Sequence, residues 1–185
     1  MTKKMDRRVK FTIMMLKDAL VKLMQDAPVS SISVKAICEL ADVNRSTFYA
    51  HFEDQFALLR YIEQEAIDNV RNYLNVQDFN DKRPLSFQVL NRILEYIRDN
   101  AALFNALLGD NYGSDIQLKL MQMAEIDSFQ TYDSVNSRTK EYISVFGLSG
   151  CVSILKKWLK DGTPESTTLI SELILKILYD GLSSF

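Results

Sequence analysis

The chain has 185 residues, 47% of them hydrophobic and 25% charged, which is the balance of a globular protein and excludes a disordered or fibrous one. Only six Gly and three Pro interrupt it, which favours long helices over strands joined by tight turns. The basic start is not followed by the apolar stretch of a signal peptide, and there is no run of about 18 apolar residues. We therefore expect a cytoplasmic protein with no membrane partner.

The net charge of −2 conceals an asymmetry along the chain. Residues 1–60 hold ten Lys and Arg against seven Asp and Glu, whereas the remaining residues hold 12 against 17. A basic first third joined to an acidic remainder indicates a polyanionic partner for the first part only.

The first helix expected from the periodicity ends near Asp26, because Pro28 disfavours helical geometry in the residue before it. Its apolar face comprises Val9, Ile13, Leu16, Leu20 and Leu23. Ser33 is the expected N-cap of a short second helix. The apolar face of this second helix comprises Val34, Ile37, Cys38 and Ala41.

Asn44 is the expected N-cap of a third helix, in which Phe48 and Phe52 lie four residues apart and face the core. Asp54 is the expected cap of a longer fourth helix. The predicted buried stripe of the fourth helix comprises Phe56, Leu59, Ile62, Ala66 and Val70.

The remainder continues the helical pattern. We expect Pro84 in the first turn of a helix whose buried residues are Leu90, Ile93, Leu94 and Ile97. Further helices are predicted over 101–108, closed by Gly109 as a left-handed C-cap, over about 116–126, over about 139–160 and from about 164 to 182. No segment alternates as a strand does, so the predicted class is all-α with about nine helices.

Two short helices joined by a tight turn, the second opening on hydroxyl and cationic residues, are typical of a helix-turn-helix. A recognition helix must place its first turn in the major groove while its other face is anchored in a core. Phe48 and Phe52 supply the anchor, and Arg45, Ser46, Thr47 and Tyr49 lie on the remaining surface. Arginine can contact guanine through two hydrogen bonds, and hydroxyls can reach phosphates or base edges.

The segment ISVKAICELADVNRSTFYAHFEDQFALL, residues 32–59, resembles the DNA-binding signature of the TetR family of bacterial transcription regulators. The positions that match the family pattern are Ile32, Val34, Ile37, Ala41, Val43, Thr47, Phe48, Tyr49, His51, Phe52, Leu58 and Leu59. The resemblance implies a homodimer that binds operator DNA, with a helix-turn-helix domain over residues 1–55 and a helical dimerisation and effector-sensing domain over residues 56–185. The implied DNA contacts are Ser33, Lys35, Asn44, Arg45, Ser46, Thr47, Tyr49 and His51.

Two positions depart from the family pattern. Asp42 replaces the usual glycine of the turn, a position that requires an unusual backbone angle that Asp tolerates. Gln55 replaces the usual lysine at the start of the fourth helix and follows Glu53 and Asp54. These carboxylates motivate an alternative function, an interaction protein that keeps the scaffold, binds DNA weakly and acts through another regulator.

Catalysis and metal binding find little support in the residues. His51 is the single histidine, which excludes a metal site built from imidazoles, and no nucleophile motif lies near it. Ser149 does not lie in a G-x-S-x-G motif, because Cys151 occupies the last position. We therefore expect no enzymatic activity and no cofactor. Cys38 and Cys151 are expected to be buried, reduced thiols.

The last two predicted helices carry more apolar surface than one core can cover. Burial within one subunit remains an alternative, but a second subunit would cover such a surface and form a two-fold interface. The predicted dimer interface comprises Gly147, Gly150, Cys151, Leu169, Leu173 and Ile177. Paired recognition helices would then read half-sites about 34–36 Å apart.

The middle of the chain is rich in aromatic residues and methionines, which at helical spacing usually form a core. In the family that the chain resembles, this region encloses a pocket for a small effector. The predicted pocket residues are Tyr96, Phe104, Tyr112, Met121 and Trp158. The sequence thus predicts a regulator, most simply a repressor that releases DNA when a small molecule binds.

Overall fold

The structure, a computed structural model, describes residues 7–74, 86–109 and 136–181. Within these ranges the chain forms eight α-helices, one short 3-10 helix and no strand, as expected for the all-α class. The elements are α1 (Arg7–Leu23), η1 (Val29–Ser31), α2 (Val34–Ala41), α3 (Arg45–Tyr49), α4 (Gln55–Leu74), α5 (Phe87–Asp99), α6 (Ala101–Leu108), α8 (Ser137–Lys160) and α9 (Thr167–Asp180). The helix predicted over about 116–126 lies outside the described residues. None of the described helices is both long and apolar enough to cross a bilayer.

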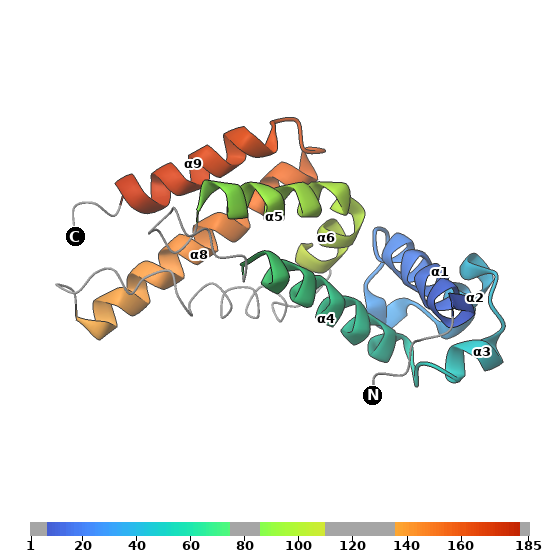
Figure 1. The fold of residues 1–185 in the computed structure, drawn as a ribbon. Helices are drawn as coiled ribbons and strands as arrows, with labels where there is room; N and C mark the ends of the chain where they lie inside the picture. Colours follow the sequence, from blue (N-terminus) through green and yellow to red (C-terminus); the bar gives the residue numbers. More distant parts are fainter. Residues whose placement is uncertain (1–6, 75–85, 110–135, 182–185) are drawn as a thin grey trace.

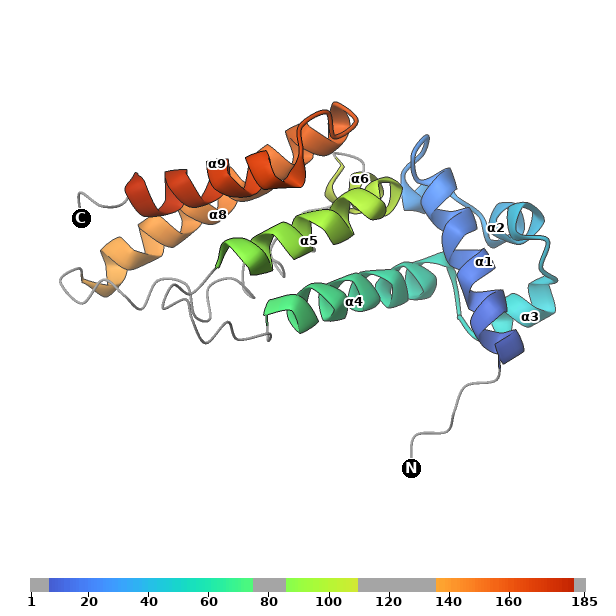
Figure 2. The same ribbon diagram turned by 45° about the horizontal axis from the view of Figure 1, so that its top comes forward.

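The helices form two groups joined by α4 (Figure 1). At one end α1 packs against α2, and α2 packs against α3. α4 leads from this group to the other and contacts α1 as well as α5. In the second group α5 packs against α9 and α6 packs against α8, as the turned view also shows (Figure 2).

The N-terminal group has the apolar core that the periodicity predicts. On α1, Ile13, Leu16 and Leu20 are buried, whereas Val9 and Leu23 at its ends are half-buried. All four residues of the predicted face of α2 are buried: Val34, Ile37, Cys38 and Ala41.

The predicted stripe of α4 is correct at four positions, Leu59, Ile62, Ala66 and Val70, and wrong at Phe56, which is 39% exposed. Phe56 lies in the first turn of α4, at the end of the buried stripe. Helical periodicity identifies a face of the helix, but it does not reveal where along the axis the packing partners end.

The C-terminal group confirms the predicted core of α5 and corrects its start. Leu90, Ile93, Leu94 and Ile97 are buried, and the helix begins at Phe87. Its N-cap is Ser86, whose hydroxyl accepts a hydrogen bond from the Val89 amide at 3.3 Å. The predicted start at Pro84, which lies outside the described residues, was therefore too early.

Gly109 corrects a second prediction. It has φ −65° and ψ 163°, an extended conformation and not the left-handed one expected of a glycine C-cap. A Cβ at this position would lie 2.6 Å from the carbonyl oxygen of Asn105. Glycine is required here because the backbone approaches α6 closely, a use that the sequence alone does not distinguish from a left-handed turn.

The turn from α8 to α9 contains Asp161, the C-cap of α8, and Gly162. Gly162 has φ 83° and donates its amide to the Leu159 carbonyl at 3.0 Å, while the Thr163 amide donates to the Trp158 carbonyl at 2.8 Å. These two bonds form a Schellman motif, which ends α8. α9 then starts at Thr167, with Ser166 as its N-cap, and not near Pro164.

Candidate nucleic-acid interface

The turn between α2 and α3 is fixed by hydrogen bonds at both of its ends. The Ser33 hydroxyl caps α2 by accepting a hydrogen bond from the Ala36 amide at 3.1 Å, as predicted. Asp42 adopts the left-handed conformation, with φ 53° and ψ 45°. The Val43 amide then donates to the Cys38 carbonyl at 3.0 Å, which satisfies an end group of α2.

Asn44 is the residue before α3, as predicted, but its side chain makes no capping hydrogen bond. Its backbone carbonyl accepts hydrogen bonds from the amides of Thr47 and Phe48 at 2.9 and 3.0 Å. The short helix starts from these backbone bonds, so the predicted side-chain cap is wrong. The Asn44 side chain is left exposed.

Two aromatic side chains anchor α3 and the turn that follows it. Phe48 is fully buried and Phe52 is 7% exposed, and their ring centroids lie 5.9 Å apart. Phe52 also contacts the Tyr61 ring of α4, with centroids 5.6 Å apart. One side of α3 is therefore held in the core, as the four-residue spacing predicted.

The opposite side of this region carries the predicted DNA-contacting residues. Seven of the eight are exposed and Thr47 is half-buried; the exposed residues are Ser33, Lys35, Asn44, Arg45, Ser46, Tyr49 and His51. Tyr49 has 53% of its surface exposed, although its ring makes an edge-to-face contact with Phe48 at a centroid distance of 5.6 Å. We call these eight positions on α2, the turn and α3, with the residue that follows α3, the recognition surface.

A shallow hollow of about 370 Å³ lies within the recognition surface, between α2 and the start of α3. It is lined by Lys35, Cys38, Glu39, Asp42, Val43, Asn44 and Arg45. Its charges are mixed, since Lys35 forms an exposed ion pair with Glu39 at 3.7 Å. Burial raises the pKa of the Cys38 thiol, against an opposing effect of the nearby Arg45 cation, so this thiol is protonated at neutral pH.

At the start of α4, a carboxylate takes up an amide donor that could otherwise bind an anion. The Asp54 carboxylate accepts a hydrogen bond from the Ala57 amide at 2.7 Å, which confirms the predicted cap. That carboxylate thus occupies one of the donors that the helix end could otherwise offer to a phosphate. Gln55 follows as the first residue of α4.

Two of the predicted pocket residues lie together where α4, α5 and α6 meet. The Tyr96 ring and the buried Phe104 ring make an edge-to-face contact at a centroid distance of 5.6 Å. The Tyr96 hydroxyl accepts a hydrogen bond from the Asn69 side-chain amide at 3.0 Å. Burial is the main cause of the raised pKa of Tyr96. Tyr112 and Met121 lie outside the described residues.

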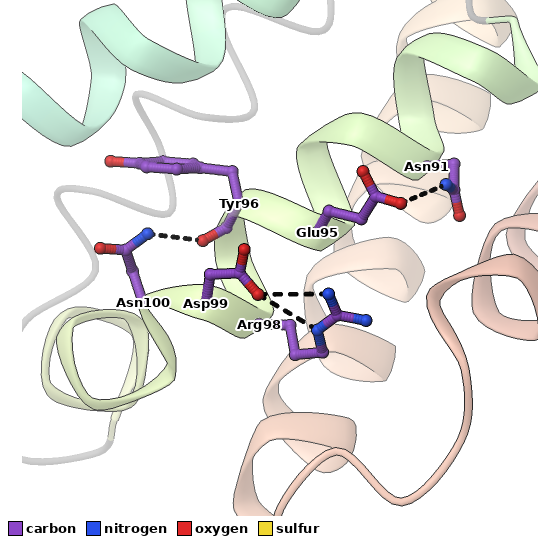
Figure 3. Close-up of polar contacts among 6 residues, drawn as sticks. All are labelled: Asn91, Glu95, Tyr96, Arg98, Asp99 and Asn100. Carbon is purple, nitrogen blue, oxygen red and sulfur yellow. Dashed lines mark hydrogen bonds and ion pairs between the residues drawn. The ribbon is translucent and has the colours of Figure 1, made fainter.

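Figure 3 shows Tyr96 among the polar side chains along α5 and at its C-terminal end. The Tyr96 ring points away from the Arg98–Asp99 ion pair, whose closest atoms are 3.2 Å apart. The Asn100 side chain donates to the Tyr96 carbonyl at 2.8 Å at the end of the helix. Tyr96 therefore presents its ring and hydroxyl to α4 and α6.

The fifth pocket candidate, Trp158, is 2% exposed. Its indole nitrogen donates to the Glu165 carbonyl at 3.1 Å, across the α8–α9 turn. This contact gives Trp158 a role in holding that turn.

Of the predicted dimer-interface residues, those on α9 are exposed, whereas those on α8 range from exposed to buried. Leu169, Leu173 and Ile177 follow one another by four residues on α9 and are 51%, 44% and 47% exposed. On α8, Gly150 is exposed, Cys151 is half-buried and Gly147 is buried within the subunit. Burial raises the pKa of the Cys151 thiol to about 11.

Two contacts that the sequence did not reveal link α1 to the rest of the molecule. Lys17 of α1 forms an ion pair with Glu65 of α4. Gln25, just after α1, donates from its side-chain amide to the Ala102 carbonyl of α6 at 2.9 Å. Their partners lie 48 and 77 residues away, and no local pattern signals such contacts.

Comparison with known proteins agrees with this architecture. Residues 85–180, more than half of the chain, match the family model for the C-terminal region of TetR transcriptional regulators. A 100-residue segment is 23% identical to an uncharacterised HTH-type transcriptional regulator, YxbF of Bacillus subtilis (strain 168). That match covers 50% of this chain but only 25% of YxbF.

Solved structures share the fold over nearly the whole chain. A TetR transcriptional regulator from Streptococcus agalactiae 2603V has a TM-score of 0.65 at 24% identity, covering 94% of this chain and 96% of that one. The dihydroxyacetone kinase operon activator DhaS has a TM-score of 0.61 at 20% identity, with 94% and 97% covered. The fatty acid degradation regulator FadR from Bacillus halodurans has a TM-score of 0.64 at 13% identity, with 98% and 99% covered. The family model and the helix-turn-helix together identify the chain as a member of the TetR family of transcriptional regulators.

Proposed function

We propose that the chain is a cytoplasmic, sequence-specific DNA-binding repressor that acts as a homodimer and releases its operator when a small molecule binds. The observation that carries this proposal is the two-sided build of α3. Phe48 and Phe52 fix one side in the core, and Arg45, Ser46 and Tyr49 stand on the other side, open to a partner. Residues 1–55 serve as the DNA-binding domain, and residues 56–185 serve dimerisation and sensing.

Each side chain of the recognition surface has a chemically suitable role. Arg45 can donate two hydrogen bonds to a guanine, and the free amide of Asn44 can pair with an adenine. Ser46, Thr47, Tyr49 and His51 donate to phosphates or base edges. Ser33 uses its oxygen to cap α2 but keeps its hydroxyl proton for a phosphate beside Lys35.

The exposed apolar stripe of α9, formed by Leu169, Leu173 and Ile177, supports the proposed homodimer. Three large aliphatic side chains at four-residue spacing stay open to solvent, while Ile170 and Ile174, on another face of the same helix, are buried. A second subunit would bury this stripe, with Gly150 and Cys151 beside it on α8. Two recognition surfaces would then face successive major grooves.

The contacts of α4 support a route for effector control. A ligand beside Tyr96 and Phe104 would disturb the bond from Asn69 of α4 and the position of α6. Both helices hold α1, through the Lys17–Glu65 ion pair and the Gln25–Ala102 bond. Such coupling is typically worth about 1–3 kcal/mol.

The direct test is to sequence the genomic fragments that the purified protein retains and to titrate the best of them by mobility shift. The proposal predicts one enriched motif, weaker binding by Arg45→Ala and a smaller loss with Tyr49→Phe. Both positions are exposed, so urea unfolding should be nearly unchanged and serves as the control. Binding by both variants that equals the wild type would refute the proposal.

A second candidate is an interaction protein that keeps the scaffold and works through another regulator. It is favoured by two contacts: Asp54 occupies an amide donor at the start of α4, and Glu39 pairs with Lys35. Both contacts lower the attraction of this region for DNA phosphates. Titration at two salt concentrations separates the candidates, because direct binding weakens steeply with salt, whereas the alternative predicts no shift at any salt concentration.

A further inference from the structure

The helix α3 is too short to keep its conformation without support from the rest of the molecule. It has five residues, whereas isolated helices of fewer than about 12 residues are marginal in water. The side chain of Asn44 adds no capping hydrogen bond at its start. Figure 1 shows α3 at the edge of the N-terminal group, beside α2 and before the start of α4. The orientation of α3 therefore depends on a small number of side-chain contacts.

An unbroken row of aromatic rings connects α3 to α4. The centroids of the Tyr49 and Phe48 rings lie 5.6 Å apart, and those of Phe48 and Phe52 lie 5.9 Å apart. The ring of Tyr61, on α4, makes an edge-to-face contact with Phe52 at 5.6 Å, with 66° between the ring planes. Such ring pairs favour a fixed mutual orientation in addition to the effect of burial. Among the described helices α3 packs closely only against α2, so the row of rings adds α4 to its support.

Burial in the core does not account for Tyr61. Its side chain is 37% exposed, and its hydroxyl forms no hydrogen bond with another described residue. Four residues further along the same face of α4, Glu65 forms the ion pair with Lys17 of α1. One face of α4 thus holds both α1 and the turn after α3, and the ring of Tyr61 makes the second of these contacts.

We propose that Tyr61 is a positioning residue for DNA binding: its ring holds Phe52 and so keeps α3 in the orientation in which Arg45 and Tyr49 reach DNA. This inference rests on the proposed function and adds to it a residue outside the recognition surface. Without the Tyr61 ring, α3 would occupy several orientations, and only a fraction of the molecules would be ready to bind. The apparent dissociation constant rises in inverse proportion to that fraction. A lost positioning residue therefore weakens binding to every operator variant alike, unlike a lost base contact.

The first test measures the dissociation constant for the selected operator and for its single base-pair variants. Tyr61→Leu should raise the constant about 10-fold for all of them and leave their ranking unchanged. Tyr61→Phe keeps the ring and should restore binding to within about twofold of the wild type. Phe56→Leu is the matched control, because Phe56 lies on the same helix, is 39% exposed and makes no ring contact with a described residue. An equal loss in Phe56→Leu and Tyr61→Leu would overturn the role of the ring contact.

The second test needs no DNA and follows amide hydrogen exchange by NMR in the full chain. The amides of His51 and Phe52 both donate to the Phe48 carbonyl at 2.9 Å, whereas the Ile37 amide donates to the Ser33 carbonyl within α2 at 3.1 Å. In Tyr61→Leu the first two amides should exchange about 10-fold faster and the Ile37 amide at the wild-type rate, because the opening is local. Tyr61→Phe should restore all three rates.

The outcomes separate this inference from the proposed function. Faster exchange at all three amides would show a general loss of stability, and unchanged exchange at His51 and Phe52 would show that the ring supports nothing; either result would overturn the positioning role. If the wild type retained no DNA fragment while the exchange result held, the proposed function would fail and the support of α3 by Tyr61 would stand.

Discussion

Gln25 donates a hydrogen bond from its side-chain amide to the Ala102 carbonyl at 2.9 Å, and so joins the end of α1 to α6. The same amide also donates to the Val21 carbonyl within its own segment, at 3.0 Å. Together with the Lys17–Glu65 ion pair, this contact attaches α1 to both of the elements that surround Tyr96. We propose that these two contacts transmit a change in α4 or α6 to α1, the helix that packs against α2.

Gln25→Ala should lower the free energy of unfolding by about 1 kcal/mol, the usual net value of one such hydrogen bond. Gln64 is a matched control, because its side chain bonds only within α4, to Asp68 at 3.0 Å. Gln64→Ala should change stability by less than about 0.5 kcal/mol. Urea unfolding measures both, and equal effects would show that the link to α6 contributes nothing to stability.

Ser33→Ala removes the N-cap of α2 and should lower the free energy of unfolding by about 1 kcal/mol. Ser46 is exposed in the first turn of α3 and caps no helix, so Ser46→Ala should be nearly neutral for stability. Thermal unfolding of the two variants distinguishes the capping hydroxyl of Ser33 from the exposed hydroxyl of Ser46. A larger loss in Ser46→Ala than in Ser33→Ala would contradict the assigned roles.

Asp42→Gly should raise the free energy of unfolding by about 0.5–1 kcal/mol, because glycine adopts φ 53° without the steric strain of a side chain. Asp42→Ala should have the opposite sign, since alanine tolerates the left-handed region less well than Asp does. Chemical denaturation of the pair gives both signs. A destabilised Asp42→Gly would mean that the carboxylate itself holds the turn.

The Cys151 thiol makes stability depend on pH in the alkaline range. Its pKa is raised from 9.0 to about 11 by burial, so the folded chain holds this proton more tightly than the unfolded chain. The corresponding stabilisation is fully present below pH 9 and is lost as the pH rises from 9 to 11. Wild type should therefore lose more stability than Cys151→Ala between pH 8 and pH 10.5 in urea titrations. Equal losses would show that the thiol ionises as freely in the folded state as in the unfolded one.

The local features of the fold were predictable because they depend on residues close in sequence. The caps at Ser33 and Asp54 each join residues three apart, and the anchor pair Phe48 and Phe52 lies one helical turn apart. The unusual backbone angle of Asp42 followed from its place in the turn. The recognition surface could therefore be outlined from the sequence.

The predictions from sequence fail where the position of a residue depends on contacts with distant parts of the chain. They also fail where a side chain and the backbone could each supply the hydrogen bond that starts a helix. Phe56 fits the stripe of α4 but lies in its first turn, and Gly109 is demanded by the Asn105 carbonyl and not by its own φ. Asn44 can cap α3, yet its backbone carbonyl alone starts the helix. The hydrogen bond between Asn69 of α4 and Tyr96 of α5 joins residues 27 apart in the sequence, and helical periodicity does not predict such a contact.

The central claim, that the recognition surface reads DNA sequence, is tested most directly by combining Arg45→Ala with single base-pair changes in the selected operator. Arg92, exposed on α5, gives the matched control Arg92→Ala. We predict that Arg45→Ala loses about 1–3 kcal/mol of discrimination at one G·C pair per half-site and retains discrimination elsewhere, while Arg92→Ala keeps the whole pattern. Identical base preferences in wild type and Arg45→Ala would contradict the claim.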